Sequence, residues 1–469
     1  MVSTAVSAGE RVGDARRRIG FGPRFVAPVV IGSMLNPINS TMISTALVPI
    51  GKSFSAGAAA TIWLVSGLYV ASAIAQPAMG KVADRIGARR VYISGLIIVG
   101  LAGIGGLLAP SLGWLIAVRV FIGIGTSAAY PAAMAMVRKQ SQTLGQEVPG
   151  IVLGWLTIAG LVSAAIGPAL GGLLISAAGW RAIFAVNIPL AVIGLILTLL
   201  WLPKDEPEHH KDSAWVSLDP FGVVLFTGLL LPLLVFLMDL KHPAWWSLGL
   251  SVVIAAVMAG WELRAPKPFI DLRMLAANGP LVRTYARYGA AYLVIYCILY
   301  GYPQWMQEAG HYSAGTVGLI TLPMSVVAAL CSWFGSRKKK ILGPLVIGTI
   351  AMIVATVGLS TVSATAAVWF LAAIGIVFGI PNGLNAVGNQ AALYQQAPPE
   401  QTGTAAGLFR TAQYIGAIAS SSLISLFYGE RATTGGLHTI GMVLGALSVL
   451  LLLATVVDPS VVRRRKRTG

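Results

Sequence analysis

Apolar residues dominate the chain in long runs that short polar segments interrupt. Fourteen of these runs reach the roughly 20 residues that a helix needs to cross the hydrocarbon layer of a membrane. They cover residues 25–49, 60–79, 91–109, 112–137, 150–176, 180–202, 218–238, 245–262, 284–305, 312–335, 341–360, 366–390, 402–428 and 436–457. Helices are favoured over strands, because a helical span satisfies all of its backbone hydrogen bonds internally in lipid. The pattern therefore predicts an all-α membrane protein.

The composition agrees with this pattern and excludes a soluble protein. Of the 469 residues, 56% are hydrophobic and 10% are charged, with a mean hydropathy of +0.79. Soluble globular chains are about 45–50% apolar and about 25% charged, so this chain has too few polar side chains to cover its surface. Its two cysteines, Cys297 and Cys331, lie inside apolar runs without metal-ligand spacing. We expect both to be small core residues, and we expect no metal or other cofactor.

Basic residues are distributed unevenly between the two sets of connecting segments. With a cytoplasmic N-terminus, 26 of the 33 lysines and arginines fall in cytoplasmic segments, four in outer segments and three inside spans. Cytoplasmic loops carry such an excess, so both termini are predicted to be cytoplasmic. The net charge of +17 is then a feature of topology, because it gathers at span ends beside anionic lipid headgroups. Nucleic acid is not expected as a partner.

One polar segment, "GKVADRIGARR" at 80–90, places five charges between two apolar runs. Its glycines permit a tight turn, and a loop that only fixes topology would explain the charge. The spacing also matches the pattern G-x-x-x-D-R-x-G-R-R, by which the chain resembles the major facilitator superfamily. The residues that carry this match are Gly80, Asp84, Arg85, Gly87, Arg89 and Arg90.

Further motifs resemble the fourteen-helix drug:proton antiporter branch of that family. Arg119 and Gly123 resemble its R-x-x-x-G motif, and residues 179–194 resemble its sixth span. The fifth span is similar to a pattern that marks antiporters, in which a proline kink and small residues let helices touch. That pattern comprises Gly154, Ser163, Gly167, Pro168, Gly171 and Gly172.

The resemblance implies the major facilitator fold, with fourteen transmembrane helices arranged as two six-helix halves and a central inserted pair. It implies a site near the midplane between the halves and alternating access. The 80–90 loop would latch the outward-facing state, with Asp84 facing a helix N-terminus of the other half. The implied divisions are an N-terminal tail at 1–24, a first half at 25–202, a linker with inserted spans seven and eight at 203–262, a second half at 263–457 and a basic tail at 458–469.

The function that the resemblance implies is active export of amphipathic, drug-like small molecules across the cell inner membrane, with antibiotic resistance as a consequence. Protons are a candidate coupling ion, and a monomer is expected. Two alternatives stay open: a dedicated exporter or facilitator of one organic anion or lipid-like metabolite, and a membrane sensor or assembly partner that transports nothing. The retained gating-loop and kink motifs argue against the sensor.

Tyrosines recur every four residues in the ninth span, at Tyr288, Tyr292, Tyr296 and Tyr300, and so share one helix face. Aromatic belts explain tyrosines near the membrane interfaces, but Tyr292 and Tyr296 lie about midway through the span. Buried phenols need hydrogen-bond partners. We therefore expect Tyr292 and Tyr296 to line a substrate cavity.

Polar side chains also gather on single faces of three other spans. Because amides that face lipid are costly, these faces are expected to point into the bundle. Hydrogen bonds between helices and contact with a substrate explain them equally well. The residues are Asn36, Asn39 and Ser40 in the first span, Ser66, Tyr69, Ser72 and Gln76 in the second, and Asn382, Asn385 and Asn389 in the twelfth.

The first span departs from the antiporter branch at one position, since Asn39 stands where that branch carries an aspartate. No acidic residue or histidine lies near the midplane, whereas Arg119 and Arg410 lie well inside their spans. We predict that Arg119 hydrogen-bonds Asn39 and that the cavity is electropositive. Such a cavity prefers anionic, zwitterionic or neutral substrates over cationic ones. Proton coupling would then run through acids at span ends or through the substrate itself.

Motifs for catalysis and metal binding are weak. Gly123 and Gly125 resemble part of a dinucleotide fingerprint, but they lie mid-span with no preceding strand. The segment "EHHKD" at 208–212 is a charged loop in which solvated histidines are expected. No Ser-His-Asp set or carboxylate pair lies at a plausible depth, so the chain is not expected to be an enzyme.

Overall fold

The computed structural model describes residues 20–146, 150–205, 219–266, 268–337, 341–398 and 402–462. The regular structure within these ranges is helical. The helices are α2 (Pro23–Met42), η1 (Ile43–Thr45), α3 (Leu47–Phe54), α4 (Ala58–Thr61), α5 (Trp63–Ile86), α6 (Ala88–Leu107), α7 (Leu112–Leu144), α8 (Gly150–Ala178), α9 (Ala182–Ala185), α10 (Asn187–Trp201), α12 (Pro220–Met238), α13 (Trp245–Glu262), α14 (Leu272–Ala277), α15 (Gly279–Glu308), α16 (Ala314–Arg337), α17 (Leu342–Thr361), α18 (Val368–Gln396), α19 (Thr402–Tyr428), α20 (Thr434–Val457) and α21 (Pro459–Val462). The tail before residue 20, the "EHHKD" segment and the basic run at 463–467 lie outside the described residues, as do the side chains of Asp84 and Arg85 and the surroundings of Gly154.

Twelve helical segments of the described chain are long and apolar enough to cross a membrane, where the sequence analysis expected fourteen. The difference comes from α15 and α19, which are helices of 30 and 27 residues. Both carry many polar side chains: α15 has six tyrosines, and α19 contains the serine run at 420–422. These two helices therefore fall short on apolarity and not on length.

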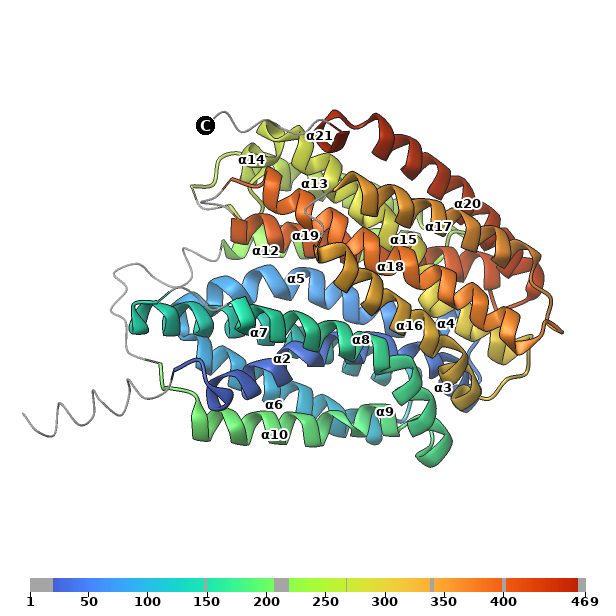
Figure 1. Ribbon diagram of the computed structural model, residues 1–469, viewed down its shortest axis with the longest axis horizontal. Helices are drawn as coiled ribbons and strands as arrows, with labels where there is room; N and C mark the ends of the chain where they lie inside the picture. The colour runs from blue at the N-terminus through green and yellow to red at the C-terminus, as the bar shows by residue number, and fades with distance from the viewer. Residues whose placement is uncertain are drawn as a thin grey trace, which may run out of the picture.

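Contacts between helices sort them into two bundles. In the N-terminal bundle, α7 contacts α2, α5 and α6, while α2 packs on α8 and α10 on α6. In the C-terminal bundle, α18 contacts α15, α16 and α17, while α20 packs on α17. Figure 1 shows the first bundle in blue to green below the second in yellow to red. The bundles meet along a surface, here called the seam, where α5 packs on α19, α8 on α16 and η1 on α15.

Helices α12 and α13 form a hairpin between the two bundles in sequence. They pack on each other, and α12 also contacts α5 and α19, one helix from each bundle. The inserted pair therefore covers one edge of the seam.

The bundle has two distinct ends. Short helices α3, α4 and α9 lie at one end and α14 and α21 at the other (Figure 1). We call the end with Gly87, Asp205 and Asp458 the basic end, because the predicted cytoplasmic charges lie there, and the end with α3, α4 and α9 the opposite end.

Small residues of α8 let this helix touch both bundles. A Cβ on Gly167 would lie 1.8 Å from Oγ1 of Thr41 in α2, and a Cβ on Gly172 would lie 2.5 Å from the carbonyl oxygen of Ala314 in α16. Pro168 lies inside α8, and the Ser163 hydroxyl donates to the carbonyl of Gly160 at 3.0 Å. The antiporter-like motif thus allows a close approach of the two bundles at the opposite end.

Candidate functional site

Six tyrosines meet at the seam, and we call them the tyrosine cluster: Tyr69 of α5, Tyr288, Tyr292, Tyr296 and Tyr300 of α15, and Tyr414 of α19. The row on α15 is continuous. Ring centroids are 4.6 Å apart for Tyr288 and Tyr292, 5.3 Å for Tyr292 and Tyr296, and 5.7 Å for Tyr296 and Tyr300. All six side chains are at most 9% exposed. The four-residue spacing therefore produces an aromatic ladder inside the protein.

Tyr69 connects this ladder to the N-terminal bundle. Its ring centroid lies 5.1 Å from that of Tyr296 and 5.6 Å from that of Tyr414. Its hydroxyl lies 2.7 Å from the Tyr300 hydroxyl, which in turn donates to the carbonyl of Ser40 at 2.9 Å. Because Tyr300 uses its proton on Ser40, Tyr69 is the donor in the pair. One hydrogen-bonded chain thus joins α2, α5 and α15 across the seam.

Gln413 of α19 forms hydrogen bonds both with the tyrosine ladder and with the charged side chain of Arg410. Its Nε2 donates to the Tyr296 hydroxyl at 2.8 Å, and its Oε1 accepts from the Tyr288 hydroxyl at 3.3 Å and from Nη1 of Arg410 at 3.0 Å. The Tyr414 hydroxyl donates to Oε1 of Gln76 in α5. Amide side chains therefore satisfy phenols that would otherwise be buried without partners.

Arg410 lies next to the cluster but is exposed. It lies eight residues inside α19, which begins at Thr402. The phenols of Tyr130, Tyr288 and Tyr292 lie within its electrostatic range. Tyr130, on α7 of the other bundle, is itself 40% exposed. Toward the basic end, the seam therefore leaves a guanidinium and a phenol uncovered between the bundles.

The seam is closed at the opposite end. The amides of Ala58 and Ala59 in the N-terminal bundle donate to the carbonyls of Glu430 and Gly429 at 3.2 and 2.8 Å. Ser44, whose side chain is fully buried, lines a void of only about 10 Å³ between the bundles. Backbone hydrogen bonds and close glycine contacts thus leave no passage around these residues.

Arg119 is buried, unlike Arg410. Its side chain is 2% exposed, with Nε donating to the carbonyl of Leu64 at 2.9 Å and Nη1 to the carbonyl of Asn39 at 3.0 Å. Nη2 has no partner among the described residues. The Asn39 amide instead donates to Oδ1 of Asn187 at 2.6 Å. Arg119 therefore contacts Asn39 through the backbone and opens onto no space in this conformation.

The other predicted amides occupy different surroundings. Asn36 is half-buried and donates to Oγ1 of Thr126 in α7 at 2.9 Å. Asn385 points toward α17, since its Nδ2 lies 3.1 Å from where a Cβ on Gly348 would be. Asn389 accepts from Nε of Arg287 at 2.8 Å, and Asn382 is half-buried. Of the three amides on α18, two thus lie inside the C-terminal bundle and away from the seam.

The predicted gating loop is tied to its own bundle through Asp205. The amides of Arg89 and Arg90 donate to Oδ1 and Oδ2 of Asp205 at 3.1 and 2.9 Å. Gly87 adopts a φ of +104°, and a Cβ on it would lie 2.3 Å from Asp205. A carboxylate at the N-terminus of α6 is favoured by the helix dipole, and only glycine fits beside it. The loop turn is therefore built around Asp205 at the start of the linker.

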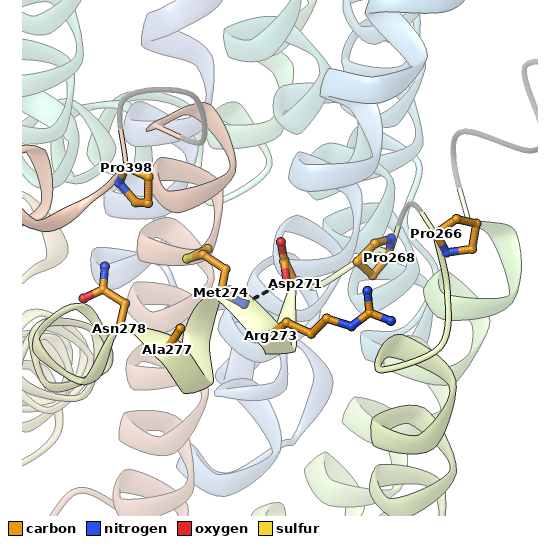
Figure 2. A pocket seen from close by; sticks show the side chains of 8 residues that line it. All are labelled: Pro266, Pro268, Asp271, Arg273, Met274, Ala277, Asn278 and Pro398. Carbon is orange, nitrogen blue, oxygen red and sulfur yellow. Dashed lines mark hydrogen bonds between the residues drawn. The ribbon is translucent and has the colours of Figure 1, made fainter.

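A cavity of about 430 Å³ lies at the basic end, away from the tyrosine cluster. Figure 2 shows its lining: Pro266, Pro268, Asp271, Arg273, Met274, Ala277, Asn278 and Pro398. Its charged side chains have local roles, since Asp271 caps α14 by accepting from the Met274 amide at 2.9 Å and Arg273 donates to the carbonyl of Leu263. Among the described residues, no three histidines, cysteines or acidic residues come together to hold a metal. We place the candidate site at the seam.

Comparisons with known proteins identify the family. The sequence model described as Major Facilitator Superfamily matches residues 29–421. The chain belongs to this superfamily. The chain is therefore a multi-pass membrane transporter and not an enzyme.

Several members of the superfamily are similar over most of the chain. The MFS-type transporter YwoD of Bacillus subtilis is 33% identical over 91% of this chain and 95% of its own length. The tetracenomycin C resistance and export protein of Streptomyces glaucescens is 27% identical, over 86% of this chain and 75% of its own. A multidrug resistance protein B homolog of Mycobacterium tuberculosis is 26% identical, over 85% and 74%. Among solved structures, the inward open xylose transporter XylE of E. coli aligns with a TM-score of 0.64 at 13% identity, covering 95% of this chain and 97% of XylE.

Part of this candidate site was predicted from the sequence, and part was not. The α15 tyrosines and the second-span face with Tyr69 and Gln76 were predicted from periodicity. Gln413 and Tyr130 were not, although Gln413 lies three residues after Arg410, where an α-helix brings side chains together. Tyr130 joins the site only because the two bundles face each other, which no local pattern encodes.

Proposed function

We propose that this transporter exports amphipathic, drug-like small molecules across the cytoplasmic membrane by alternating access through the seam. The observation that carries the proposal is the exposed Arg410 beside a ladder of buried tyrosines at the junction of two bundles. Aromatic faces bind flat apolar molecules, and a few polar groups orient them. The export and multidrug-resistance relatives support the same function, since each matches more than four fifths of this chain.

The charge at the seam favours neutral, zwitterionic or anionic molecules over cations. Arg410 stands among phenols and the Gln413 amide, groups that leave its positive charge uncompensated. A cation entering this region would be repelled by this positive charge. The same observation favours a second candidate function, dedicated export of one organic anion.

The proposed membrane placement puts the basic end in the cytoplasm, following the excess of lysine and arginine there. Helices α15 and α19 would then cross as well, giving fourteen spans with both termini inside. Their polar side chains are tolerated because they face the seam and the C-terminal bundle rather than lipid. The monomer is the proposed unit, with anionic lipid headgroups at the basic end. Closure at the opposite end and exposure at Arg410 then describe a state open to the cytoplasm.

Transport by reconstituted protein tests the proposal. Proteoliposomes with an imposed pH gradient are loaded with an anionic amphipathic dye or with a permanently cationic dye. The anionic dye is expected to move, with a rate at least tenfold lower in Arg410→Gln and largely kept in Arg410→Lys. Gradient-driven movement of the quaternary cation that survives Arg410→Gln would contradict the proposed charge preference.

Resistance profiles separate the two candidates. In an efflux-deficient bacterial host, expression of the chain is expected to raise resistance to several unrelated amphipathic compounds. Resistance to a single compound would favour the dedicated exporter. Resistance to none, with no dye transport in vesicles, would contradict both.

A further inference from the structure

The inserted pair carries a buried carboxyl group that the seam does not use. Glu262 is the last residue of α13, and its side chain is 0% exposed. Neither Oε1 nor Oε2 has a hydrogen-bond partner among the described residues. Burial disfavours the carboxylate more than the nearby backbone amides of Ile270 and Phe269 favour it, so the group tends to take a proton or another cation.

A second carboxyl group faces Glu262. Asp219 is the N-cap of α12, and both side chains converge on Gly222: a Cβ there would lie 2.3 Å from Oδ2 of Asp219 and 2.9 Å from Oε1 of Glu262. Asp219 takes the local donors, namely the amides of Gly222 and Phe269 at 3.0 Å and Nε1 of Trp261 at 2.9 Å. Asp219 thereby occupies these donors, and Glu262 is left without one in this geometry.

Helix electrostatics act in the same direction. The N-terminus of α12 favours the Asp219 anion, whereas Glu262 lies at the C-terminus of α13, where the helix dipole disfavours negative charge. Two carboxylates that face each other cannot both ionise without strong repulsion. Burial, the facing carboxyl group and the helix dipole thus all favour the neutral form of Glu262.

The cation that faces this pair comes from the gating-loop helix. Lys81 follows Gly80 on α5, and its ammonium group donates to the carbonyl of Pro268 at 3.1 Å and lies 5.7 Å from the ring centroid of Phe269. The ammonium is within electrostatic range of both Asp219 and Glu262. Any movement of the end of α5 therefore changes the positive field at Glu262.

Other charged groups nearby are engaged elsewhere. Arg264 donates to the carbonyl of Gly260, Arg273 to that of Leu263, and Asp271 accepts from the Met274 amide. Lys267 lies outside the described residues. The charged groups that face Glu262 in the described structure are therefore Asp219 from α12 and Lys81 from α5.

We propose that Glu262 is a proton-binding site, paired with Asp219 and controlled by Lys81 on the gating-loop helix. When the end of α5 moves away during the transport cycle, Glu262 binds its proton more tightly; when Lys81 approaches, the proton is released. The site lies in the inserted helix pair, outside the substrate region. Its use for coupling rests on the proposed transport function, but its occupancy by a proton does not.

Infrared spectroscopy tests the occupancy directly. The full-length protein in lipid vesicles is titrated while the C=O stretch of protonated carboxylic acids is recorded. We expect such a band at neutral pH that disappears on alkalinisation, that Glu262→Gln removes, and that the control Asp271→Asn keeps. The control replaces an acid at the same end with a residue that still caps α14. Absence of the band at neutral pH, or its survival in Glu262→Gln, would overturn the proposal.

A second variant tests whether Lys81 affects proton binding at Glu262. Lys81→Met removes the facing cation and is expected to move the midpoint of the Glu262 band upward by about one pH unit. An unchanged midpoint would overturn the link to the gating helix. Exchanging sodium for choline at constant ionic strength is expected to leave the midpoint unchanged; a midpoint that falls in sodium would show a metal-cation site instead.

Transport then separates this proposal from the proposed function. In proteoliposomes, Glu262→Gln is expected to abolish the response of dye export to the pH gradient while leaving exchange down a dye gradient. An unaltered response would exclude Glu262 from coupling. Failure of the wild-type chain to move any dye would contradict the proposed function and leave the infrared result standing.

Discussion

Arg119 on α7 and Arg410 on α19 are both arginines inside predicted spans, but their surroundings differ. Arg119 lies toward the closed, opposite end and is 2% exposed, with two of its nitrogens bound to backbone carbonyls of α2 and α5. Arg410 lies toward the basic end, exposed beside Gln413 and the phenols. The first region is held together by the protein's own groups, and the second is available to a molecule from outside. The comparison separates an arginine that holds the structure together from one that we propose to contact the substrate.

Alanine substitutions of the two arginines should differ most in the stability that each one costs. Arg119→Ala removes two hydrogen bonds from a charged donor and leaves a cavity, so it is expected to cost roughly 3 kcal/mol of stability. Arg410→Ala is expected to cost less than about 0.5 kcal/mol, because the side chain is exposed. Thermal unfolding of the purified variants measures both. Equal losses would contradict the division.

Forcing the closed region apart should be the next largest effect. Gly172→Val places side-chain atoms against the carbonyl of Ala314, and it is expected to open the opposite end. In a cysteine-free background with Ser44→Cys, labelling by an impermeant thiol reagent from the opposite side should become at least tenfold faster. Gly113→Val is the matched control, since nothing lies within 4 Å of a Cβ at Gly113, and it should leave the rate unchanged.

Removing the Tyr300 hydroxyl should loosen the closed end of the seam less than Gly172→Val does. Tyr300→Phe deletes the bonds to Tyr69 and Ser40 while keeping the aromatic stack, at a cost of about 1 kcal/mol to the closed arrangement. That corresponds to a rise of about fivefold in Ser44→Cys labelling. No change would mean that packing alone closes the seam.

Disrupting the buried ion pair of Asp458 and Arg287, which lies outside the seam, is expected to have the smallest effect on the seam. Burial opposes ionisation of Asp458, but hydrogen bonds from Ser460 and the charges of Arg283 and Arg287 outweigh it and hold the pKa of the carboxyl below its ordinary value. The carboxylate thus stabilises the fold above about pH 4, and this contribution is lost as the pH falls through the folded-state pKa. Asp458→Asn should therefore lower the unfolding temperature at pH 7, with a difference that shrinks in acid. Ser44→Cys labelling should not change.

Twelve of the fourteen expected spans could be predicted from long apolar runs, and the tyrosine face from local periodicity. The sequence also placed Arg119 beside Asn39, although the contact is with the backbone carbonyl, which sequence does not distinguish from the side chain. Asn382 and Asn385 were predicted to line the cavity, and Asn389 shares their helix face, but which neighbour that face meets depends on the packing of α17 and α15. The pairing of Asp219 with Glu262 could not be predicted, since 43 positions separate them and only the inserted hairpin brings them together.

Accessibility measured from each side of the membrane tests the central claim most directly. In a cysteine-free background without substrate, Arg410→Cys and Ser44→Cys are labelled separately with an impermeant reagent added at the basic end or at the opposite end. The account predicts that Arg410→Cys reacts rapidly from the basic end only and that Ser44→Cys reacts at least tenfold more slowly from either end. Protection of Arg410→Cys at the basic end, or rapid labelling of Ser44→Cys from the opposite end, would contradict it.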